Sequence, residues 1–592
     1  MNPSDQAAVR LLETLRASKV FGQLAEPVLL DLAAALNLLS FEGGHQLLKE
    51  GEVADSMIIV ISGRLRVSRQ DPVAGLCLYN EVCPGETVGE TGLLLQQRRF
   101  ADVTAVRDST VAFLYRGAFE QLLQRHPVAL NRVFAQALYH QLRHTPQVAE
   151  QRRAQTFALI PLNAGVATEE ACTALVEALQ TFGKALRVPM IQQAPESFDA
   201  LEHQFDYLIF EGSAEDTAET RRAFRQADQV IFVANAGDSR DPSEFERALA
   251  DEAGFAMKRK HLLLVHASDA TVPDAPPPWL GPRDVERLYP VRSGRDRDFA
   301  RLARFLTSRA VGVVLGGGGA RGFSHLGVLQ AFEELGVPVD LIGGNSMGAL
   351  IGAQYASAVP LDEILERTRR FAMGGERPTL PLISLLSGQR ISRDLRRMFG
   401  EQTIEQLWRP FFAAACNLSR VETTVLDSGP LWRAVLASNS PAGLLPPVVH
   451  QGDLLVDGAI LDNVPISPMR ARLGTPLEQR RGNGTVIAID VDVGGALGVA
   501  PEVQRLSVMK TLKSYFSDDQ QSPSIGAILY RAGHIGGLHQ RSRTKAQADH
   551  YLAPPVTEFP IMAYRRAEEI VEIGYRHALQ QIAEWPHLPG QV

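Results

Sequence analysis

The residues GNSMG, numbers 344–348, place a serine between two glycines in the pattern G-x-S-x-G. An apolar segment precedes the pattern and a helical stretch follows it. Small neighbours let a strand turn sharply into a helix, so that the serine Oγ projects clear of the backbone. We therefore predict Ser346 as a nucleophile for acyl carbonyls, with Gly344 and Gly348 as the glycines that the turn requires.

A glycine-rich stretch, Gly316 to Gly322, follows the apolar segment 311–315 and leads into a helical pattern. Glycines there leave backbone N–H groups pointing outwards at the start of a helix, which suits a phosphate or a developing oxyanion. The stretch also matches G-x-G-x-x-G, the dinucleotide pattern. That pattern needs an acidic residue at the end of the next strand, whereas Asp340 stands before the next apolar segment. The nearby serine motif favours the oxyanion.

A serine nucleophile needs a base beside it. No later histidine follows a recognisable strand, and His325 lies within the helical stretch after the glycines, where a packing role is the simpler interpretation. Asp457 is a better candidate because it ends the apolar strand 454–456, where a carboxylate can protrude into a site. An ordinary Asp-Gly turn with Gly458 is the alternative.

These three motifs, in this order, resemble the patatin-like phospholipases, which use a Ser–Asp dyad instead of a triad. The resemblance implies an α/β hydrolase domain that needs no metal and no cofactor. Ala459 stands where many members have a second glycine. The residues it implies are Ser346 as nucleophile, Asp457 as base with Gly458 beside it, and Gly317, Gly318 and Gly319 as oxyanion donors.

The segment from Gly85 to Val103 resembles the phosphate-binding cassette of cyclic-nucleotide-binding domains. The resemblance implies that Glu90 holds the ribose hydroxyl, that Arg99 pairs with the cyclic phosphate, and that a cyclic nucleotide is a candidate effector. Asp102 departs from the family because it replaces a hydroxyl residue with a carboxylate, which repels a phosphate. Two further departures are Arg98 in the place of a proline and the bulky Phe100.

A chain of 592 residues is too long for one core, and its segments predict a multidomain protein. We expect a cyclic-nucleotide-binding-like β-roll with helices over 1–147 and a patatin-like α/β hydrolase domain over 307–592, with the motifs in 311–475. Between them, residues 148–306 alternate apolar strands with helical stretches and predict an α/β spacer with a parallel sheet. The strands expected there are 157–162, 207–210, 230–233 and 261–265. The spacer contains no Walker A motif.

This domain order resembles neuropathy target esterase and its bacterial relatives. The resemblance implies a lipid-ester hydrolase that acts on lysophospholipids. Two other functions stay open: a cyclic-nucleotide-responsive signalling protein with a degenerate hydrolase, and a lipid acyltransferase that uses the same acyl-enzyme.

The composition constrains the partners. A net charge of −7 argues against bulk nucleic-acid binding, and four cysteines without paired spacing favour a reducing cytoplasm. No signal peptide and no transmembrane helix are expected, so membrane contact would be peripheral, at the inner membrane surface. A basic and apolar stretch from Arg367 to Arg397 is a candidate for that contact, with a buried helix as the alternative. The sequence does not indicate an oligomeric state.

Overall fold

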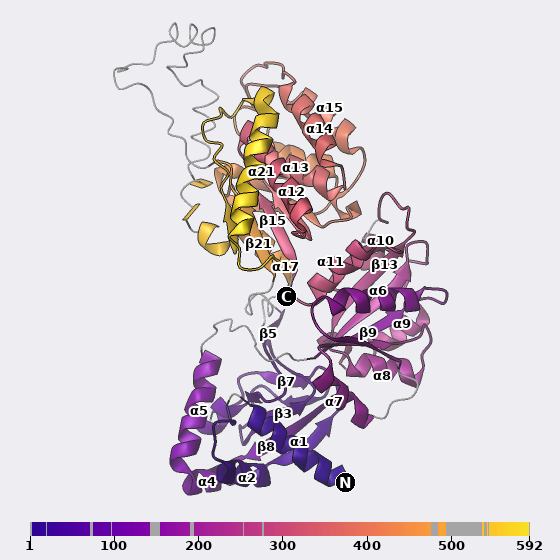
Figure 1. Cartoon of the computed structure of the whole chain (residues 1–592), viewed down its shortest axis with the longest axis vertical. Helices are drawn as coiled ribbons and strands as arrows, with labels where there is room; N and C mark the ends of the chain where they lie inside the picture. Colours follow the sequence, from indigo (N-terminus) through magenta and orange to yellow (C-terminus); the bar gives the residue numbers. More distant parts are fainter. Residues whose placement is uncertain are drawn as a thin grey trace. The chain divides into compact units, whose positions relative to one another are not determined.

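The structure, a computed structural model, describes residues 3–590 apart from 19, 72–74, 96, 143–153, 190–194, 253, 275–276, 475–483, 493–535, 538–540 and 543. It divides into two compact units (Figure 1). One takes most of residues 1–303, and the other takes most of 304–592 with a short piece that begins at Thr271. The first two expected domains therefore share one unit.

The first part of the first unit is a β-roll, as expected. Two antiparallel four-stranded sheets, in the orders β1-β8-β3-β6 and β2-β7-β4-β5, enclose a core of aliphatic side chains. A second core joins the roll to its helices. The elements are β1 (Asn37–Phe41), β2 (Gln46–Leu48), β3 (Ser56–Ser62), β4 (Leu65–Asp71), β5 (Gly75–Val82), β6 (Thr87–Val88), β7 (Asp102–Ala105) and β8 (Ser109–Tyr115), with α1 (Pro3–Ala17), α2 (Glu26–Ala35), α3 (Glu90–Leu95), α4 (Arg116–Arg125) and α5 (Pro127–Leu142).

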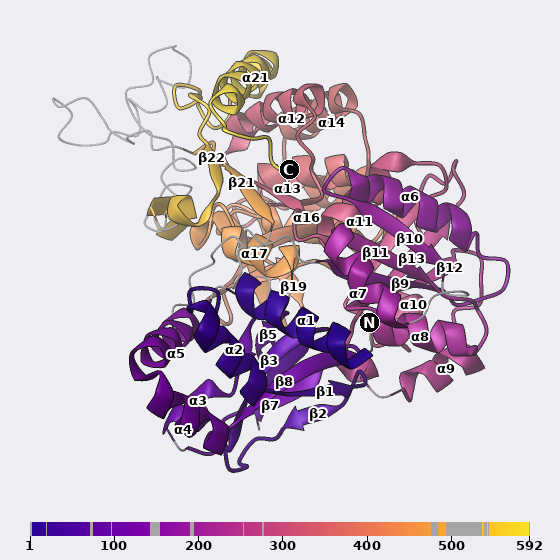
Figure 2. The ribbon, with the colours of Figure 1, turned by 60° about the horizontal axis from the view of Figure 1, so that its bottom comes forward.

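The second part is an α/β layer whose sheet is entirely parallel, in the order β10-β11-β9-β12-β13-β14. Helices cover both faces of this sheet (Figure 2), and its central strands are therefore continuous apolar runs. The strands are β9 (Gln155–Pro161), β10 (Ala185–Pro189), β11 (Tyr207–Glu211), β12 (Gln229–Asn235), β13 (Arg259–His266) and β14 (Arg287–Arg292), and the helices are α6 (Thr168–Gln180), α7 (Pro195–Gln204), α8 (Ala218–Gln226), α9 (Glu244–Ala250), η2 (Phe255–Met257), α10 (Pro277–Leu280) and α11 (Asp296–Leu306).

The four strands expected in this layer are confirmed as β9, β11, β12 and β13. The sequence prediction missed β10 and β14. Both are edge strands and carry charged or half-exposed side chains, so neither forms an apolar run.

The second unit contains an eight-stranded mixed sheet in the order β19-β20-β17-β16-β15-β21-β22, with β18 also paired to β17. Strands β15, β16, β17, β21 and β22 run parallel, while β18 and β20 run antiparallel to β17. The strands are β15 (Val311–Leu315), β16 (Leu341–Gly344), β17 (Phe411–Asn417), β18 (Glu422–Leu426), β19 (Val448–His450), β20 (Asp453–Asp457), β21 (Thr485–Ile489) and β22 (His550–Leu552).

This unit has the following helices, most of which share one core with the sheet. They are η3 (Gly319–Phe323), α12 (Ser324–Leu335), α13 (Met347–Ala356), α14 (Leu361–Met373), α15 (Gln389–Phe399), η4 (Ile404–Gln406), α16 (Leu431–Ser438), η5 (Gly458–Ile460), α17 (Ile466–Leu473), η6 (Tyr564–Arg566) and α21 (Ala567–Ala583).

Helices α12 and α21 lie side by side in both views (Figures 1 and 2). A glycine on each helix permits the close approach. A Cβ on Gly327 would lie 1.9 Å from the Val571 oxygen, and a Cβ on Gly574 would lie 2.2 Å from the Ser324 oxygen. This pair fixes the start of α12 and with it the end of the glycine-rich stretch.

Among the described residues, no helix combines the length and the apolar character needed to cross a membrane.

Candidate active site

Ser346 occupies a sharp turn between β16 and α13. Its φ of 52° and ψ of −123° form a conformation that costs about 1–3 kcal/mol for a residue with a side chain. A Cβ on Gly344 would lie 2.7 Å from the Gly348 carbonyl carbon, and one on Gly348 would lie 2.2 Å from the Leu315 oxygen, so the turn requires both glycines. Within residues 341–356, Ser346 is the one side chain that is not buried. Its Oγ has no hydrogen-bond partner in the described part of the chain and is open to a substrate.

Two residues at the end of α16 hold the backbone of Ser346. The Ser346 N–H donates to Ser438 Oγ at 2.9 Å, and Asn439 Nδ2 donates to the Ser346 carbonyl at 2.8 Å. The Ser438 hydroxyl in turn donates to Asn345 Oδ1 at 3.1 Å. These bonds offset the cost of the strained turn. Ser438 and Asn439 are not among the residues predicted from the sequence, because a side chain that binds backbone more than 90 residues away leaves no local pattern.

The sheet brings Asp457 to the level of Ser346. Gly344 of β16 pairs with Ala413 of β17, and Asp457 of β20 pairs with Ala415, two residues farther along β17. Ser346 lies two residues beyond Gly344, so the serine and the aspartate flank β17 from its two neighbouring strands. Two strand spacings, about 10 Å, separate β16 from β20.

The residues next to the serine and the aspartate are in direct contact. A Cβ on Gly458 would lie 2.6 Å from Asn345 Oδ1. Asp457 is buried, and its Oδ1 accepts the Ala459 N–H at 3.0 Å. Burial, with the Asp457 carboxylate as the second cause, raises the pKa of the Cys416 thiol. The aspartate is thus fixed in a poorly solvated position beside the turn.

A second carboxyl group lies five residues farther along the chain. Burial raises the pKa of Asp462 to about 6, and its N–H donates to the Gly458 carbonyl at 3.0 Å. Asp462 is not among the residues predicted from the sequence. It sits after the 3-10 turn η5 rather than at the end of a strand, so no register argument places it opposite Ser346.

The glycine-rich stretch lies directly against the serine. A Cβ on Gly317 would lie 3.0 Å from Ser346 Cβ and 2.9 Å from Asn463 Oδ1. The Gly317 N–H donates to Asn463 Oδ1 at 3.1 Å, and Asn463 Nδ2 donates back to the Gly317 carbonyl at 3.1 Å. Gly317 therefore fits the site by its lack of a side chain, while its N–H already has an acceptor. Among the described residues, the N–H groups of Gly318 and Gly319 have none.

His325 supports this stretch from inside the protein. Its Nε2 bonds to the Gly316 carbonyl at 2.8 Å, so that nitrogen carries the proton. The side chain is fully buried, and burial lowers the pKa of His325 to about 4. A neutral, immobile imidazole behind the glycines agrees with the expected packing role.

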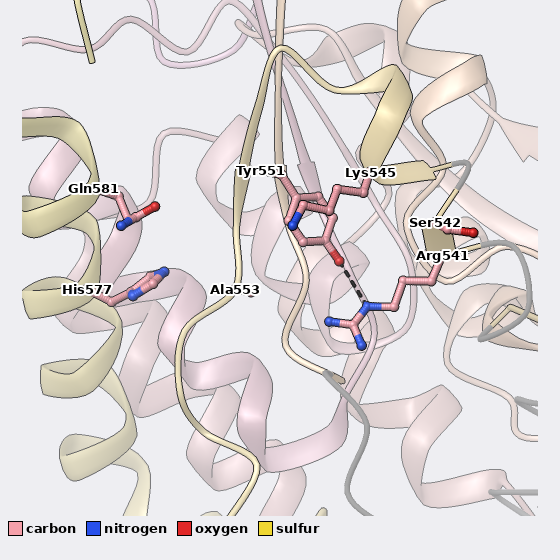
Figure 3. A pocket seen from close by; sticks show the side chains of 7 residues that line it. All are labelled: Arg541, Ser542, Lys545, Tyr551, Ala553, His577 and Gln581. Carbon is pink, nitrogen blue, oxygen red and sulfur yellow. Dashed lines mark hydrogen bonds between the residues drawn. The ribbon is translucent and has the colours of Figure 1, made fainter. Parts of the chain in front are cut away.

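A cavity of about 620 Å³ lies elsewhere in this unit, beside β22 and α21 (Figure 3). Its lining includes Arg541, Lys545 and His577, and Arg541 Nε donates to the Tyr551 hydroxyl at 3.2 Å. Strand β22 is the edge strand farthest from β20, so none of the predicted catalytic residues lines this cavity. No group of three His, Cys, Asp or Glu side chains within the described ranges is arranged to hold a metal ion.

In the cassette of the first unit, the side chain of Arg99 points inwards. Arg99 is buried, and its guanidinium donates to the Ser56 carbonyl at 2.6 Å, to Ser56 Oγ at 3.1 Å and to the Gly89 carbonyl at 3.3 Å. Glu90 is fully buried and accepts the Thr87 hydroxyl at 2.9 Å, and burial raises the pKa of its carboxyl group.

Two of the departures from the cassette pattern have structural roles. Asp102 accepts the Glu50 N–H at 2.7 Å through Oδ1, so its carboxylate is part of the roll's own bonding. Phe100 is 59% exposed and packs edge-on against Tyr79. The ring therefore lies at the surface rather than in a ligand pocket.

Three family models match successive parts of the chain. Residues 38–126 match the cyclic nucleotide-binding domain, residues 153–291 match the P-loop like domain of the neuropathy target esterase family, and residues 313–470 match the patatin-like phospholipases. The middle match is more specific than the expected spacer, although this segment lacks a Walker A motif.

Curated relatives match along almost the whole chain. Lysophospholipase nte1 of Aspergillus fumigatus is 27% identical over 96% of the chain, which corresponds to 43% of that protein. Human patatin-like phospholipase domain-containing protein 6 is 28% identical over 96% of the chain and 46% of its own length. The chain thus spans less than half the length of these relatives. In this order, the chain therefore carries matches to a cyclic nucleotide-binding domain, a P-loop like domain of the neuropathy target esterase family and a patatin-like phospholipase domain.

Proposed function

We propose that the chain hydrolyses carboxylic esters of lipids, with lysophospholipids as the preferred substrates. The observation that carries this proposal is the arrangement of Ser346 and Asp457 on the two sides of β17, with Gly317 packed against the serine. The names of the relatives, lysophospholipase and patatin-like phospholipase, support the substrate class.

In the proposed reaction Asp457 accepts the proton of Ser346 Oγ as that oxygen attacks the acyl carbonyl. The N–H groups of Gly318 and Gly319 stabilise the oxyanion of the tetrahedral intermediate. The ester bond then breaks, and the aspartate returns its proton to the departing alcohol. Water attacks the resulting acyl-enzyme with Asp457 again as base, which releases the fatty acid and restores the serine.

The chain's own groups supply every proton transfer in this scheme, which therefore uses no cofactor. Gly317 contributes space rather than a donor, because its N–H is bonded to Asn463. A lipid alcohol in place of water would give acyl transfer, and the product identifies which acceptor is used.

The direct test is the release of fatty acid from a lysophospholipid by wild type, Ser346→Ala and Ser467→Ala. We expect Ser346→Ala to lose at least about a thousandfold in rate. The exposed Ser467 serves as the control serine. A fluorophosphonate ester should label wild type and Ser467→Ala but not Ser346→Ala. Full activity in Ser346→Ala would contradict the mechanism.

For the cyclic nucleotide-binding domain we propose a weak effector site formed by Glu90 and Arg99. A cyclic phosphate must compete for the arginine with the carbonyls of Ser56 and Gly89. It also enters a site where the Asp102 carboxylate adds repulsion.

We also propose that the protein works in the cytoplasm, at the inner membrane surface. All four cysteines are free, which fits a reducing compartment. A lipid substrate and the exposed apolar segment described next support peripheral contact.

A further inference from the structure

The loop between α14 and α15 carries an unusual cluster of exposed aliphatic side chains. All residues from Arg377 to Ile383 are exposed. Leu380, Leu382 and Ile383 are 77%, 87% and 75% exposed. Single exposed leucines are common on soluble proteins, but three within four residues form a surface that needs a partner.

The base of this loop is firmly built. Pro378 and Leu386 form an antiparallel bridge, and the Thr379 N–H donates to the Leu385 carbonyl at 3.0 Å. Ser384 is buried, and its hydroxyl donates to the Leu386 carbonyl at 2.7 Å. The aliphatic tip of the loop, formed by Leu380, Leu382 and Ile383, therefore projects from a base that backbone and side-chain hydrogen bonds hold in place.

Helix α15 adds positive charge beside the loop. Between Met373 and Phe399 the chain has five arginines and two acidic residues, an excess of three positive charges. Arg393, Arg396 and Arg397 are all exposed. The Asp394 carboxylate pairs with Arg390 at 2.7 Å and with Arg397 at 3.9 Å, so one carboxylate is shared by two of the arginines and a positive excess remains on the helix.

Helix α14 differs from α15 in this respect. Its arginines Arg367, Arg369 and Arg370 each form ion pairs with glutamates. In the basic stretch predicted from the sequence, the arginines of α15 therefore outnumber their acidic partners, and Arg393 forms no ion pair with a described residue.

One segment connects the loop to the catalytic residues. The N–H groups of Leu385 and Leu386 donate to the carbonyls of Gly443 and Leu444 at 2.9 and 3.0 Å. A few residues earlier in that segment, Ser438 and Asn439 hold the backbone of Ser346. The Ser440 carbonyl also accepts the Asp457 N–H at 2.8 Å. The loop base and the active-site turn therefore share one support.

We propose that Leu380, Leu382 and Ile383 insert into an anionic lipid bilayer while Arg393 and Arg397 bind its headgroups. The proposal rests on the proposed lipid substrate. Separate aliphatic side chains on a projecting loop, with cations one helix away, match an interfacial anchor. A protein interface would instead surround its apolar centre with a polar rim. The positive excess selects an anionic surface.

The test is co-sedimentation of the full chain with vesicles of phosphatidylcholine alone and with about 30 mol % phosphatidylglycerol. All variants are made on a Ser346→Ala background, so binding is measured without turnover. Leu380→Ser/Leu382→Ser/Ile383→Ser removes the aliphatic tip, and Arg393→Glu/Arg397→Glu reverses the charge. Val128→Ser and Arg132→Glu are the controls, because both residues are exposed on α5 of the other unit and Val128 is 76% exposed.

We expect the aliphatic triple variant to bind anionic vesicles at least about tenfold more weakly. The charge-reversal variant should also lose about tenfold on anionic vesicles but remain unchanged on neutral ones. Both controls should bind as the parent does. Circular dichroism and thermal unfolding verify that each variant is folded.

Parental binding by the triple variant would overturn the proposal. So would a parent that ignores vesicles but self-associates through this loop, detected as a larger species by size-exclusion chromatography that the triple variant lacks. Failure of the hydrolase proposal is a separate result, because it appears as absent fatty-acid release in active wild type and leaves vesicle binding unaltered.

Discussion

The Ser346 turn and the Arg99 cassette are both motifs that contain several glycines. Each places one candidate functional side chain near a helix. At Ser346 the surrounding side chains are buried while the hydroxyl stays accessible. At Arg99 the guanidinium is buried, and its donors are used by Ser56 and Gly89. Both motifs lie in the folds that the sequence predicts, but three hydrogen bonds within the protein already hold the Arg99 guanidinium, whereas Ser346 Oγ has no partner among the described residues. A sequence motif therefore predicts the conformation of the backbone. Whether the side chain can bind a ligand depends on the hydrogen-bond acceptors that already surround it.

The largest effect should come from Asp457→Asn, which keeps the shape of the base but removes its basicity. We expect the rate of lysophospholipid hydrolysis to fall by about a thousandfold or more, with unfolding temperature little changed. Asp462→Asn is the matched control, since it removes the neighbouring carboxyl group. A larger loss in the control than in Asp457→Asn would transfer the role of base to Asp462.

The buried imidazole of His325 should make the catalytic unit sensitive to acid. Its pKa is about 4 in the folded protein and near 6.5 when unfolded, so only the unfolded chain takes up a proton between these values. The contribution of the neutral His325 imidazole to the free energy of unfolding is fully present above pH 6.5. It falls by about 3 kcal/mol as the pH drops to 4.

His325→Gln retains an N–H donor for Gly316 but does not titrate. Urea unfolding from pH 7 to 4 should therefore show a shallower loss of stability in this variant than in wild type. Parallel pH profiles for the two proteins would exclude His325 as the source.

Gly317→Ala should show how far the site depends on the absence of a side chain at this position, because the variant adds a methyl group and keeps the backbone N–H. The added methyl group meets Ser346 Cβ at 3.0 Å and Asn463 Oδ1 at 2.9 Å, so the serine must shift. We expect about a hundredfold loss in kcat, because small displacements of a nucleophile are costly. Gly237→Ala, where a Cβ meets nothing within 4 Å, is the control and should retain wild-type kinetics.

The smallest effect is expected from substitution of Arg99 in the cassette. It should change the free energy of unfolding more than the affinity for a ligand. Arg99→Ala leaves the Ser56 and Gly89 carbonyls without their donor and should lower the free energy of unfolding of the first unit by about 2 kcal/mol. Arg98→Ala removes one bond of an exposed side chain and serves as the control.

Titration calorimetry with cyclic AMP should give wild type a Kd of about 100 µM or weaker. Submicromolar affinity would show that Arg99 exchanges its partners readily, and the contrast between the two motifs would then disappear.

The sequence predicted the elements that carry the chemistry better than the bonds that hold them. The turn at Ser346 and the strand that ends at Asp457 have local signatures, namely flanking glycines and an apolar run. The partners Ser438 and Asn439 have none, because their side chains bind distant backbone. The use of the Gly317 N–H by Asn463 was equally out of reach, since it depends on how two loops meet.

The solvent exposure of the loop between α14 and α15 could not be predicted from the sequence either. The run from Thr379 to Leu386 is compatible with a buried helix or an exposed loop, and its composition does not distinguish them. The structure does so through Ser384, which is buried at the base while the preceding aliphatic residues project outwards. Likewise, the charges of α14 and α15 look alike in the sequence and differ only in their partners.

If the loop binds lipid as proposed, the segment from Ser438 to Leu444 links that contact to Ser346. It bonds to the loop base at one end and to the strained serine turn at the other. Lipid that holds the loop therefore also restricts the support of Ser346, so the bilayer would act as an activator as well as a store of substrate. Vesicles without any hydrolysable lipid should then accelerate the cleavage of a water-soluble ester, which is interfacial activation.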